Sequence, residues 1–276
     1  MLSLEDLPDE IILKIFNLIN IKDLFRCLAV NKKLRMIAND QSLWNTMHLT
    51  DRLPAELLPQ ILAKGCQHLS LYHVHINNGS ANFPNNFHLK YLADENLWTH
   101  QDGVDIYPDL ASSCYGLEKL SVPVFPWDFS KASKIFKCII QNSKGLKVLH
   151  INDSDYYSDP AKFTMSFESV KLIVTLCVEL TELNIDNTVL SQESIDFVCE
   201  NITPKIEKLN ISWKDSFGDK QLNMLLSRCK KLTEFAFTGT KVSNKSVRTI
   251  IETLSPTLLK LEASSEYISL SGTGGN

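Results

Sequence analysis

The chain has 276 residues, of which 44% are hydrophobic and 22% are charged, and its 28 basic and 32 acidic side chains give a formal net charge of −4. This balance is typical of a globular protein, and it excludes the strongly basic surface of a nucleic-acid-binding protein. Charged and amide side chains interrupt every apolar stretch before the roughly 18 to 20 residues that a membrane-spanning helix needs, so we expect no membrane segment.

The N-terminus and the cysteines favour an intracellular protein. Acidic residues stand where a secretory signal would carry basic ones, and no cleavage site follows the apolar positions. The cysteines are odd in number and include no Cys-x-x-Cys pair. They are Cys27, Cys66, Cys114, Cys138, Cys177, Cys199 and Cys229. We therefore expect buried thiols in a protein of the cytoplasm, the nucleus or both.

Residues 8–44 predict three short helices. Pro8 suits the first turn of a helix in which apolar residues recur at steps of three and four as far as Ile19. A break at residues 20–22 precedes a second helix, and Asn31 is the expected cap of a third. So small a unit displays apolar side chains on more than one face. Either the rest of the chain or a second polypeptide must cover them.

These residues also resemble a known family. The segments that carry the resemblance are Leu7-Pro8-Asp9-Glu10-Ile11-Ile12, Ile15-Phe16, Asp23-Leu24, Val30-Asn31-Lys32-Lys33-Leu34 and Asp40-Gln41-Ser42-Leu43-Trp44. In order and spacing they resemble the F-box over most of residues 4–48. Leu34 stands where the family often has an aromatic, and Ile21 replaces the usual loop proline, which points to a weaker affinity for the family's partner.

The resemblance implies that this segment binds the small Skp adaptor, which joins a substrate receptor to a cullin-RING ubiquitin ligase of the SCF type. Seven residues fall where family members contact the adaptor or brace the contacting helices. They are Leu7, Pro8, Ile11, Ile15, Leu24, Val30 and Trp44.

From residue 60 onward the chain repeats a pattern of the form L-x-x-L-x-ϕ, where ϕ is apolar. The clearest copies are Leu117-Leu120-Val122, Leu146-Leu149-Ile151, Leu180-Leu183-Ile185, Ile206-Leu209-Ile211, Leu232-Phe235-Phe237 and Leu258-Leu261-Ala263. Their first positions lie 29, 34, 26, 26 and 26 residues apart. Two weaker copies precede them, around residues 66–74 and 89–92. The 34-residue step contains a polar insertion at residues 153–163, which we expect to be a surface loop.

Polar residues such as Lys119 and Ser121 alternate with the apolar ones, which predicts strands that are buried on one face only. Amphipathic helices follow the strands, as at residues 195–199, 222–229 and 247–254. A doubly wound sheet is excluded, because strands covered on both faces would read as continuous apolar runs. The predicted fold is therefore α/β, with helices on the convex side of a horseshoe.

Cys114, Cys177 and Cys229 each lie three residues before the first leucine of a repeat, which indicates small buried positions. This placement resembles the cysteine-containing class of leucine-rich repeat that accompanies F-boxes, and the S-phase-kinase-associated type is the most similar. The resemblance implies an F-box at residues 1–50 and a right-handed leucine-rich-repeat solenoid of about eight repeats at residues 51–265. A disordered Gly/Ser-rich tail follows at residues 266–276.

No motif points to catalysis. The chain lacks a phosphate-binding glycine loop, a Gly-x-Ser-x-Gly motif and paired metal ligands, although His73 and His75 would share a strand face. We expect neither an enzyme nor a bound metal or cofactor.

The remaining function is binding of a protein substrate, through polar residues on the concave face and through loops at the strand ends. The candidate residues are His150, Asp153, Tyr156, Asn184, Asn210 and Trp213. Two alternatives stay open. Trp213 could fold over the repeat core, and the helical N-terminus could be the cap of a repeat scaffold or inhibitor unrelated to ubiquitin.

Overall fold

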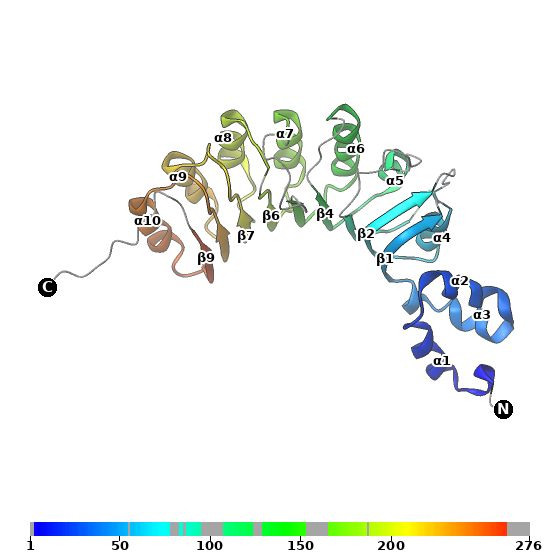
Figure 1. Ribbon diagram of the computed structural model, residues 1–276. Coiled ribbons are helices and arrows are strands. Elements are labelled where there is room, and N and C mark those ends of the chain that lie inside the picture. Colours follow the sequence, from blue (N-terminus) through cyan, green and yellow to red (C-terminus); the bar gives the residue numbers. More distant parts are fainter. Residues whose placement is uncertain are drawn as a thin grey trace.

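A computed structural model describes residues 3–54, 56–77, 83–84, 87–94, 107–123, 129–152, 165–186 and 188–263. Within them the chain forms one curved parallel sheet with its helices along the convex side, and a group of short helices lies beside the first strand (Figure 1). The expected tail at residues 266–276 and the insertion at residues 153–163 lie outside the described residues. The mixed α/β class with N-terminal helices is confirmed.

Short helices make up residues 3–44, which we call the N-terminal helical segment. They are η1 (Leu4–Asp6), α1 (Asp9–Phe16), α2 (Ile21–Val30), α3 (Lys32–Ala38) and η2 (Gln41–Leu43). Asn31 caps α3 as expected, because its Oδ1 accepts a hydrogen bond from the Leu34 amide at 2.9 Å. Pro8 precedes α1 as its N-cap residue instead of lying in its first turn.

Two expected helix boundaries in this segment are wrong. The helix α1 ends at Phe16, so Ile19 lies beyond it, and α2 begins at Ile21 inside the expected break. Asn20 explains the early start of α2, because its Oδ1 accepts a hydrogen bond from the Asp23 amide at 2.9 Å. Asn20 was expected in the break between the two helices, whereas it is the N-cap residue of α2.

The sheet contains nine strands among the described residues, and its spatial order is the order of the chain. They are β1 (Thr46–Pro54), β2 (His68–Asn77), β3 (Tyr91–Asp94), β4 (Lys119–Pro123), β5 (Val148–Asn152), β6 (Glu182–Asn184), β7 (Lys208–Asn210), β8 (Glu234–Ala236) and β9 (Lys260–Glu262). The strands expected from the repeats are all present. The strand β1 was not expected, and it spans residue 50, where the predicted helical domain ends.

Most of the connections between strands contain a helix, and these helices cover one face of the sheet (Figure 1). They are α4 (Leu57–Ala63), α5 (Tyr107–Ser113), α6 (Phe129–Asn142), α7 (Phe167–Leu176), α8 (Gln192–Asn201), α9 (Asp219–Arg228) and α10 (Asn244–Leu254). Three of them begin alike, since Ser166, Ser191 and Ser243 each accept a hydrogen bond from the amide three residues ahead. In α10, Ile251 is exposed and does not join the core as the periodicity suggested.

Strand pairing aligns the second apolar position of the repeats, so that Leu120, Leu149, Leu183, Leu209 and Phe235 form one row across the sheet, which Leu261 of β9 continues. The first five are buried and Leu261 is half-buried. Their polar neighbours along each strand lie on the other face, which the helices leave open. The strands are thus covered on one side only, and the open side is the concave face of the sheet (Figure 1).

The repeated cysteines are core residues. Cys114, Cys177 and Cys229 are buried, and this burial raises the pKa of their thiols to about 12, about 12 and about 11. Such thiols are almost fully protonated and unreactive near neutral pH. Cys27 and Cys138 are only half-buried, so the expectation of buried thiols is wrong for these two.

Candidate functional site

The seven residues of the N-terminal helical segment that the sequence singles out divide into two groups. The accessible group consists of Leu7 and Ile15, which are half-buried, and of Pro8, Ile11 and Val30, which are exposed. Ile11 is 40% exposed and Val30 is 62% exposed, so the rest of the chain does not seal them. Leu24 and Trp44 are buried, and in this position they can brace the helices but cannot contact a partner directly.

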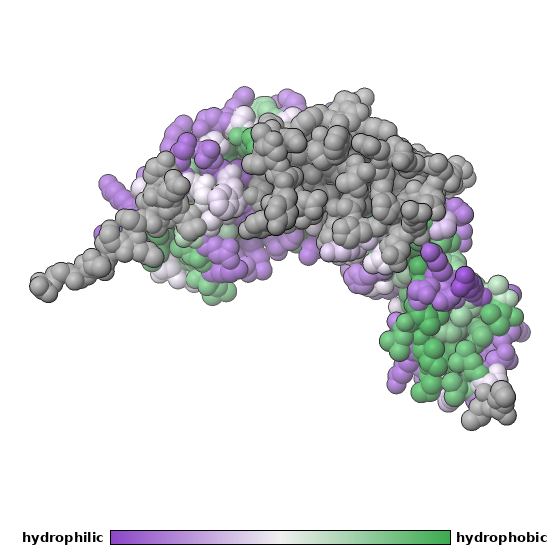
Figure 2. Space-filling view, viewed as in Figure 1, coloured by the Kyte–Doolittle hydropathy of each residue, from purple (hydrophilic) through white to green (hydrophobic). Residues whose placement is uncertain are grey.

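Further apolar side chains of this segment face solvent. Leu4, Leu18 and Met36 are exposed in addition to Ile11 and Val30. Figure 2 shows the result as a broad hydrophobic area over the N-terminal helical segment. An exposed apolar area of this kind marks an interaction surface on a folded protein. The family pattern did not single out Leu4, Leu18 or Met36, although their apolar character in a segment too small to bury them was visible in the sequence.

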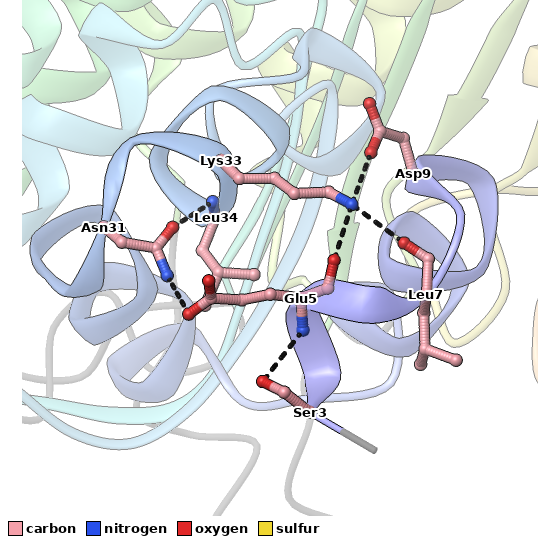
Figure 3. Close-up of polar contacts among 7 residues, drawn as sticks. All are labelled: Ser3, Glu5, Leu7, Asp9, Asn31, Lys33 and Leu34. Atoms are coloured by element: carbon pink, nitrogen blue, oxygen red, sulfur yellow. Dashed lines mark hydrogen bonds and ion pairs between the residues drawn. The ribbon is translucent and has the colours of Figure 1, made fainter.

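Lys33 holds the turn that carries Leu7 and Pro8. Its Nζ donates hydrogen bonds to the carbonyl oxygens of Glu5 and Leu7, at 2.8 and 2.9 Å, and lies 3.3 Å from a carboxylate oxygen of Asp9 (Figure 3). Hydrogen bonds from a charged donor are stronger than neutral ones. One side chain of α3 therefore fixes the path of the chain into α1. The sequence did not identify Lys33 as a site residue, because its acceptors are backbone atoms far away along the chain.

Asn31 also connects the start of α3 to the segment that precedes α1. While its Oδ1 caps α3, its Nδ2 donates to a carboxylate oxygen of Glu5 at 2.6 Å (Figure 3). Ser3 and Asp6 close a capping box around η1. The segment before α1 is thereby ordered on the surface of α3, so its exposed apolar residues are held in a fixed arrangement.

Trp44 joins the N-terminal helical segment to the sheet. Its Nε1 donates to the carbonyl oxygen of Ala38 at 2.8 Å, and Phe25 meets its ring edge-to-face at a centroid distance of 5.2 Å. The Nζ of Lys64, which follows α4, lies 5.6 Å from the ring centroid and also donates to Asn39. The helices and the start of the sheet therefore share one buried aromatic residue.

The concave face carries a row of alternating charges toward its C-terminal end. Strand pairing places Glu182, Lys208, Glu234 and Lys260 side by side on β6 to β9. Lys208 and Glu234 form an ion pair at 2.6 Å, which raises the pKa of the lysine and lowers that of the glutamate. His150 of β5 is opposite Asn184, diagonally across from Glu182, with its Nε2 2.7 Å from Glu182 Oε1. These side chains line a shallow hollow of about 170 Å³.

Two of the predicted substrate-binding residues lie on the concave face and also form hydrogen bonds with the loops that follow their strands. Asn184 Oδ1 accepts a hydrogen bond from the Asp186 amide, and Asn210 Oδ1 accepts one from the Ser212 amide. Both asparagines also line the hollow beside His150. The structure thus brings His150, Asn184 and Asn210 together on one face. Asp153 and Tyr156 lie outside the described residues.

Toward the N-terminal end the same face is aromatic. Tyr91 of β3 lies between His68 of β2 and Lys119 of β4. The Nζ of Lys119 is 5.1 Å from the centroid of the Tyr91 ring, and the His68 ring is 6.4 Å from it. The sequence did not single out these three residues, because strand register alone brings them together.

Trp213 is exposed, so it does not fold over the core. It is 60% exposed and has a φ of 58°, which is uncommon for a residue with a side chain. Its ring packs on the backbone of Gly239, where an added Cβ atom would lie 2.4 Å from a ring carbon. The backbone amide of Trp213 donates to the carbonyl oxygen of Thr238 at 2.7 Å. The aromatic ring is therefore held in place and available to a partner.

Lys214, the residue that follows this tryptophan, is buried. It is 2% exposed, and its Nζ donates to the carbonyl oxygen of Ser212 at 3.0 Å. In the neighbouring loops, buried Thr188 and Thr240 donate to carbonyl oxygens in the same way. Burial lowers the pKa of Lys214 to about 7, against a smaller opposing effect of nearby Asp186.

Two negative observations concern only the part of the chain that the structure describes. In it, no group of three or more histidine, cysteine, aspartate or glutamate residues is placed to hold a metal ion. No helix within the same residues is both long and apolar enough to cross a membrane.

The chain was compared with protein families, curated proteins and solved structures. None of the curated proteins matches the chain. A crystal structure of a protein from Bacteroides fragilis is similar with a TM-score of 0.40 and 13% sequence identity, over 78% of this chain and 65% of that protein. This likeness spans less than two thirds of that protein and is too weak to support an argument. Residues 4–50, which comprise the helices with the exposed apolar area and the start of β1, match the F-box-like family and so support an F-box protein.

Proposed function

We propose that the chain is a substrate receptor of an SCF-type ubiquitin ligase, in which the N-terminal helical segment binds a Skp adaptor. The observation that carries the proposal is the coincidence of two findings. The residues that match the F-box-like family include several exposed apolar side chains, among them Ile11 and Val30. A partner that buries these side chains would remove the apolar surface from water.

The arrangement of the segment supports this role. The Lys33 hydrogen bonds fix the turn around Pro8 before any partner arrives. A surface that is already ordered loses less conformational entropy on binding. The buried residues Leu24 and Trp44 then act as braces, which is one of the two roles that the family resemblance implies.

We further propose that the curved sheet is a leucine-rich-repeat solenoid and holds a protein substrate. Its concave face offers the imidazole of His150 and the charged groups of Glu182 and Lys208, while Trp213 offers an exposed aromatic ring. Exposed tryptophan is a typical anchor of protein interfaces, and charged groups around it contribute to specificity. In this role the protein is not an enzyme. It acts in the cytoplasm or nucleus by bringing substrate lysines close to the ubiquitin-charged enzyme.

The adaptor interface is tested by an Ile11→Ala, Val30→Ala double variant. Its affinity for a purified Skp adaptor, measured by biolayer interferometry, should fall at least about tenfold, because truncation of an interface anchor typically costs about 1 kcal/mol or more. A Val178→Ala, Ile251→Ala double variant is the matched control. These two side chains are similarly exposed but lie outside the helical segment, so their loss should leave the affinity unchanged.

The contrary result is equally clear. If the folded wild-type chain does not bind the adaptor at micromolar concentrations, the receptor function is wrong. The helical segment would then be the cap of a repeat scaffold or inhibitor.

A further inference from the structure

The strand β1 forms an edge of the sheet with backbone groups that point away from its neighbour. The carbonyl oxygen of Asn45 accepts hydrogen bonds from the amides of Gln67 and His68, both at 3.0 Å, so Asn45 faces β2. Successive residues of a strand direct their N–H and C=O groups to opposite sides. Thr46 and His48 therefore direct theirs outward.

These outward groups have no partner within the part of the chain that the structure describes. Outside the pairing of β1 with β2, no hydrogen bond joins the backbone of Thr46 or His48 to another described residue. Both residues are exposed, whereas Met47 and Leu49 between and beyond them are buried. An open strand edge of this kind is a template for pairing with another extended chain.

A groove runs along this edge. Its walls are β1 on one side and the end of α1 and the start of α2 on the other, and its volume is about 560 Å³. Figure 1 shows α2 next to β1 at this end of the sheet. The floor of the groove includes the buried apolar residues Phe16, Leu24 and Leu49. The groove is therefore large enough for several side chains and is apolar at its base.

The rim of the groove carries a positive charge. Arg26 is neutralised by an ion pair with Asp23 at 2.6 Å, which also lowers the pKa of Asp23. Lys22 also lines the groove, and no residue in the described part of the chain forms an ion pair with it. A ligand with a negative charge near Lys22 would find a complementary group there.

We propose that this groove binds an extended segment of a partner protein, which pairs with β1 as an added strand. The N–H and C=O groups of Thr46 and His48 recognise its backbone, and alternate apolar side chains of the segment enter the groove. An acidic side chain of the segment faces Lys22. Backbone pairing selects an extended peptide over a helix, because the backbone groups of a helix bond within the helix itself.

The test starts from a random linear heptapeptide library displayed on phage and selected on the full chain. Enriched peptides are synthesised, and their dissociation constants are measured by fluorescence polarisation. We expect alternating apolar residues and at least one Asp or Glu. A His48→Pro variant should bind them at least tenfold more weakly, because proline removes the outward N–H but is tolerated at a strand edge. His48→Thr keeps the N–H and should bind within twofold of wild type.

Two further measurements keep the test decisive if His48→Pro is poorly folded. Binding of an enriched peptide to the wild-type chain should slow hydrogen exchange at the His48 amide, and Lys22→Glu should weaken binding several-fold. The proposal is overturned if no peptide is enriched, if His48→Pro binds as well as His48→Thr, or if exchange at His48 does not change.

Adaptor affinity is measured on the same variants. If His48→Pro loses the adaptor while it remains folded, the groove belongs to the adaptor interface and the peptide proposal is overturned. If adaptor affinity is unchanged, the peptide result stands by itself, whether or not the chain proves to be a ligase receptor.

Discussion

The N-terminal helical segment and the sheet differ in how far their apolar residues are buried. Across the middle of the sheet the inward residues of neighbouring strands, such as Leu183 and Leu209, are buried against one another. In the helical segment, Val30 and Met36 are each 62% exposed. Each strand and helix unit of the sheet covers the next one, whereas a segment of about 40 residues is too small to bury all of its apolar residues. The sheet therefore supplies most of the stability, whereas the helical segment leaves part of its apolar surface in contact with solvent.

The largest expected effect is a loss of stability in the sheet. Leu209→Ala should lower the free energy of unfolding by about 3 kcal/mol, because it leaves a cavity between β6 and β8. Denaturation in urea measures the change. Val30→Ala, made for comparison in the helical segment, should change the free energy of unfolding by less than about 0.5 kcal/mol. Equal effects of the two substitutions would contradict this difference in burial between the sheet and the helical segment.

The buried Lys214 should make the stability of the chain depend on pH. Its pKa is about 7 in the folded chain and about 10.5 when exposed, so between these values the unfolded chain binds more protons. Stability should therefore rise with pH through this window, by up to about 1.4 kcal/mol per pH unit, and the loss is complete below about pH 7. Lys214→Met should lack this rise. Urea denaturation of both chains from pH 7.5 to 9.5 should show a difference that grows by roughly 2 to 3 kcal/mol, and parallel curves would refute the burial of a titrating lysine.

Gly239 supports the exposed tryptophan of the sheet region. It has a φ of 67°, and an added Cβ atom would collide with the Trp213 ring. Gly239→Ala should destabilise the chain by about 2 kcal/mol and shift the tryptophan fluorescence. Gly116→Ala is the matched control, since Gly116 has a φ of 76° but no atom within 4 Å of the added Cβ. It should cost only the backbone strain, about 1 kcal/mol. If both variants behave alike, the ring does not depend on the glycine.

Substitution of Lys33 in the helical segment should affect stability less than the changes at Leu209, Lys214 and Gly239. Lys33→Met removes the hydrogen bonds to the carbonyl oxygens of Glu5 and Leu7, so the turn before α1 should exchange its amide hydrogens faster. We expect adaptor affinity to fall about tenfold, while the free energy of unfolding changes by about 1 kcal/mol or less. The control is Lys32→Met, which replaces the exposed lysine next to Lys33. A loss of affinity in both variants would point to charge instead of positioning.

The sequence predicted those parts of the fold that depend on nearby residues. A cap such as Asn31 bonds to an amide three residues away, and the leucine spacing of the repeats sets which face of each strand is buried. The expected strands and most of the helices therefore appear where predicted. The strand β1 was missed because its alternating Met47 and Leu49 lack the full repeat pattern. The roles of the candidate site residues stay predictions, although the structure shows which of them are accessible.

The amino-acid sequence by itself determined the order of elements, the one-sided burial of the strands and the excess of apolar residues before residue 45. Each of these follows from periodicity or composition within a short stretch of chain. Only the tertiary structure decided that Lys33 holds the turn at Leu7, that Trp213 is exposed while Lys214 is buried, and that one edge of β1 is open beside a groove. Those features depend on atoms from residues that are distant along the chain, and their proximity is set by strand register and helix packing.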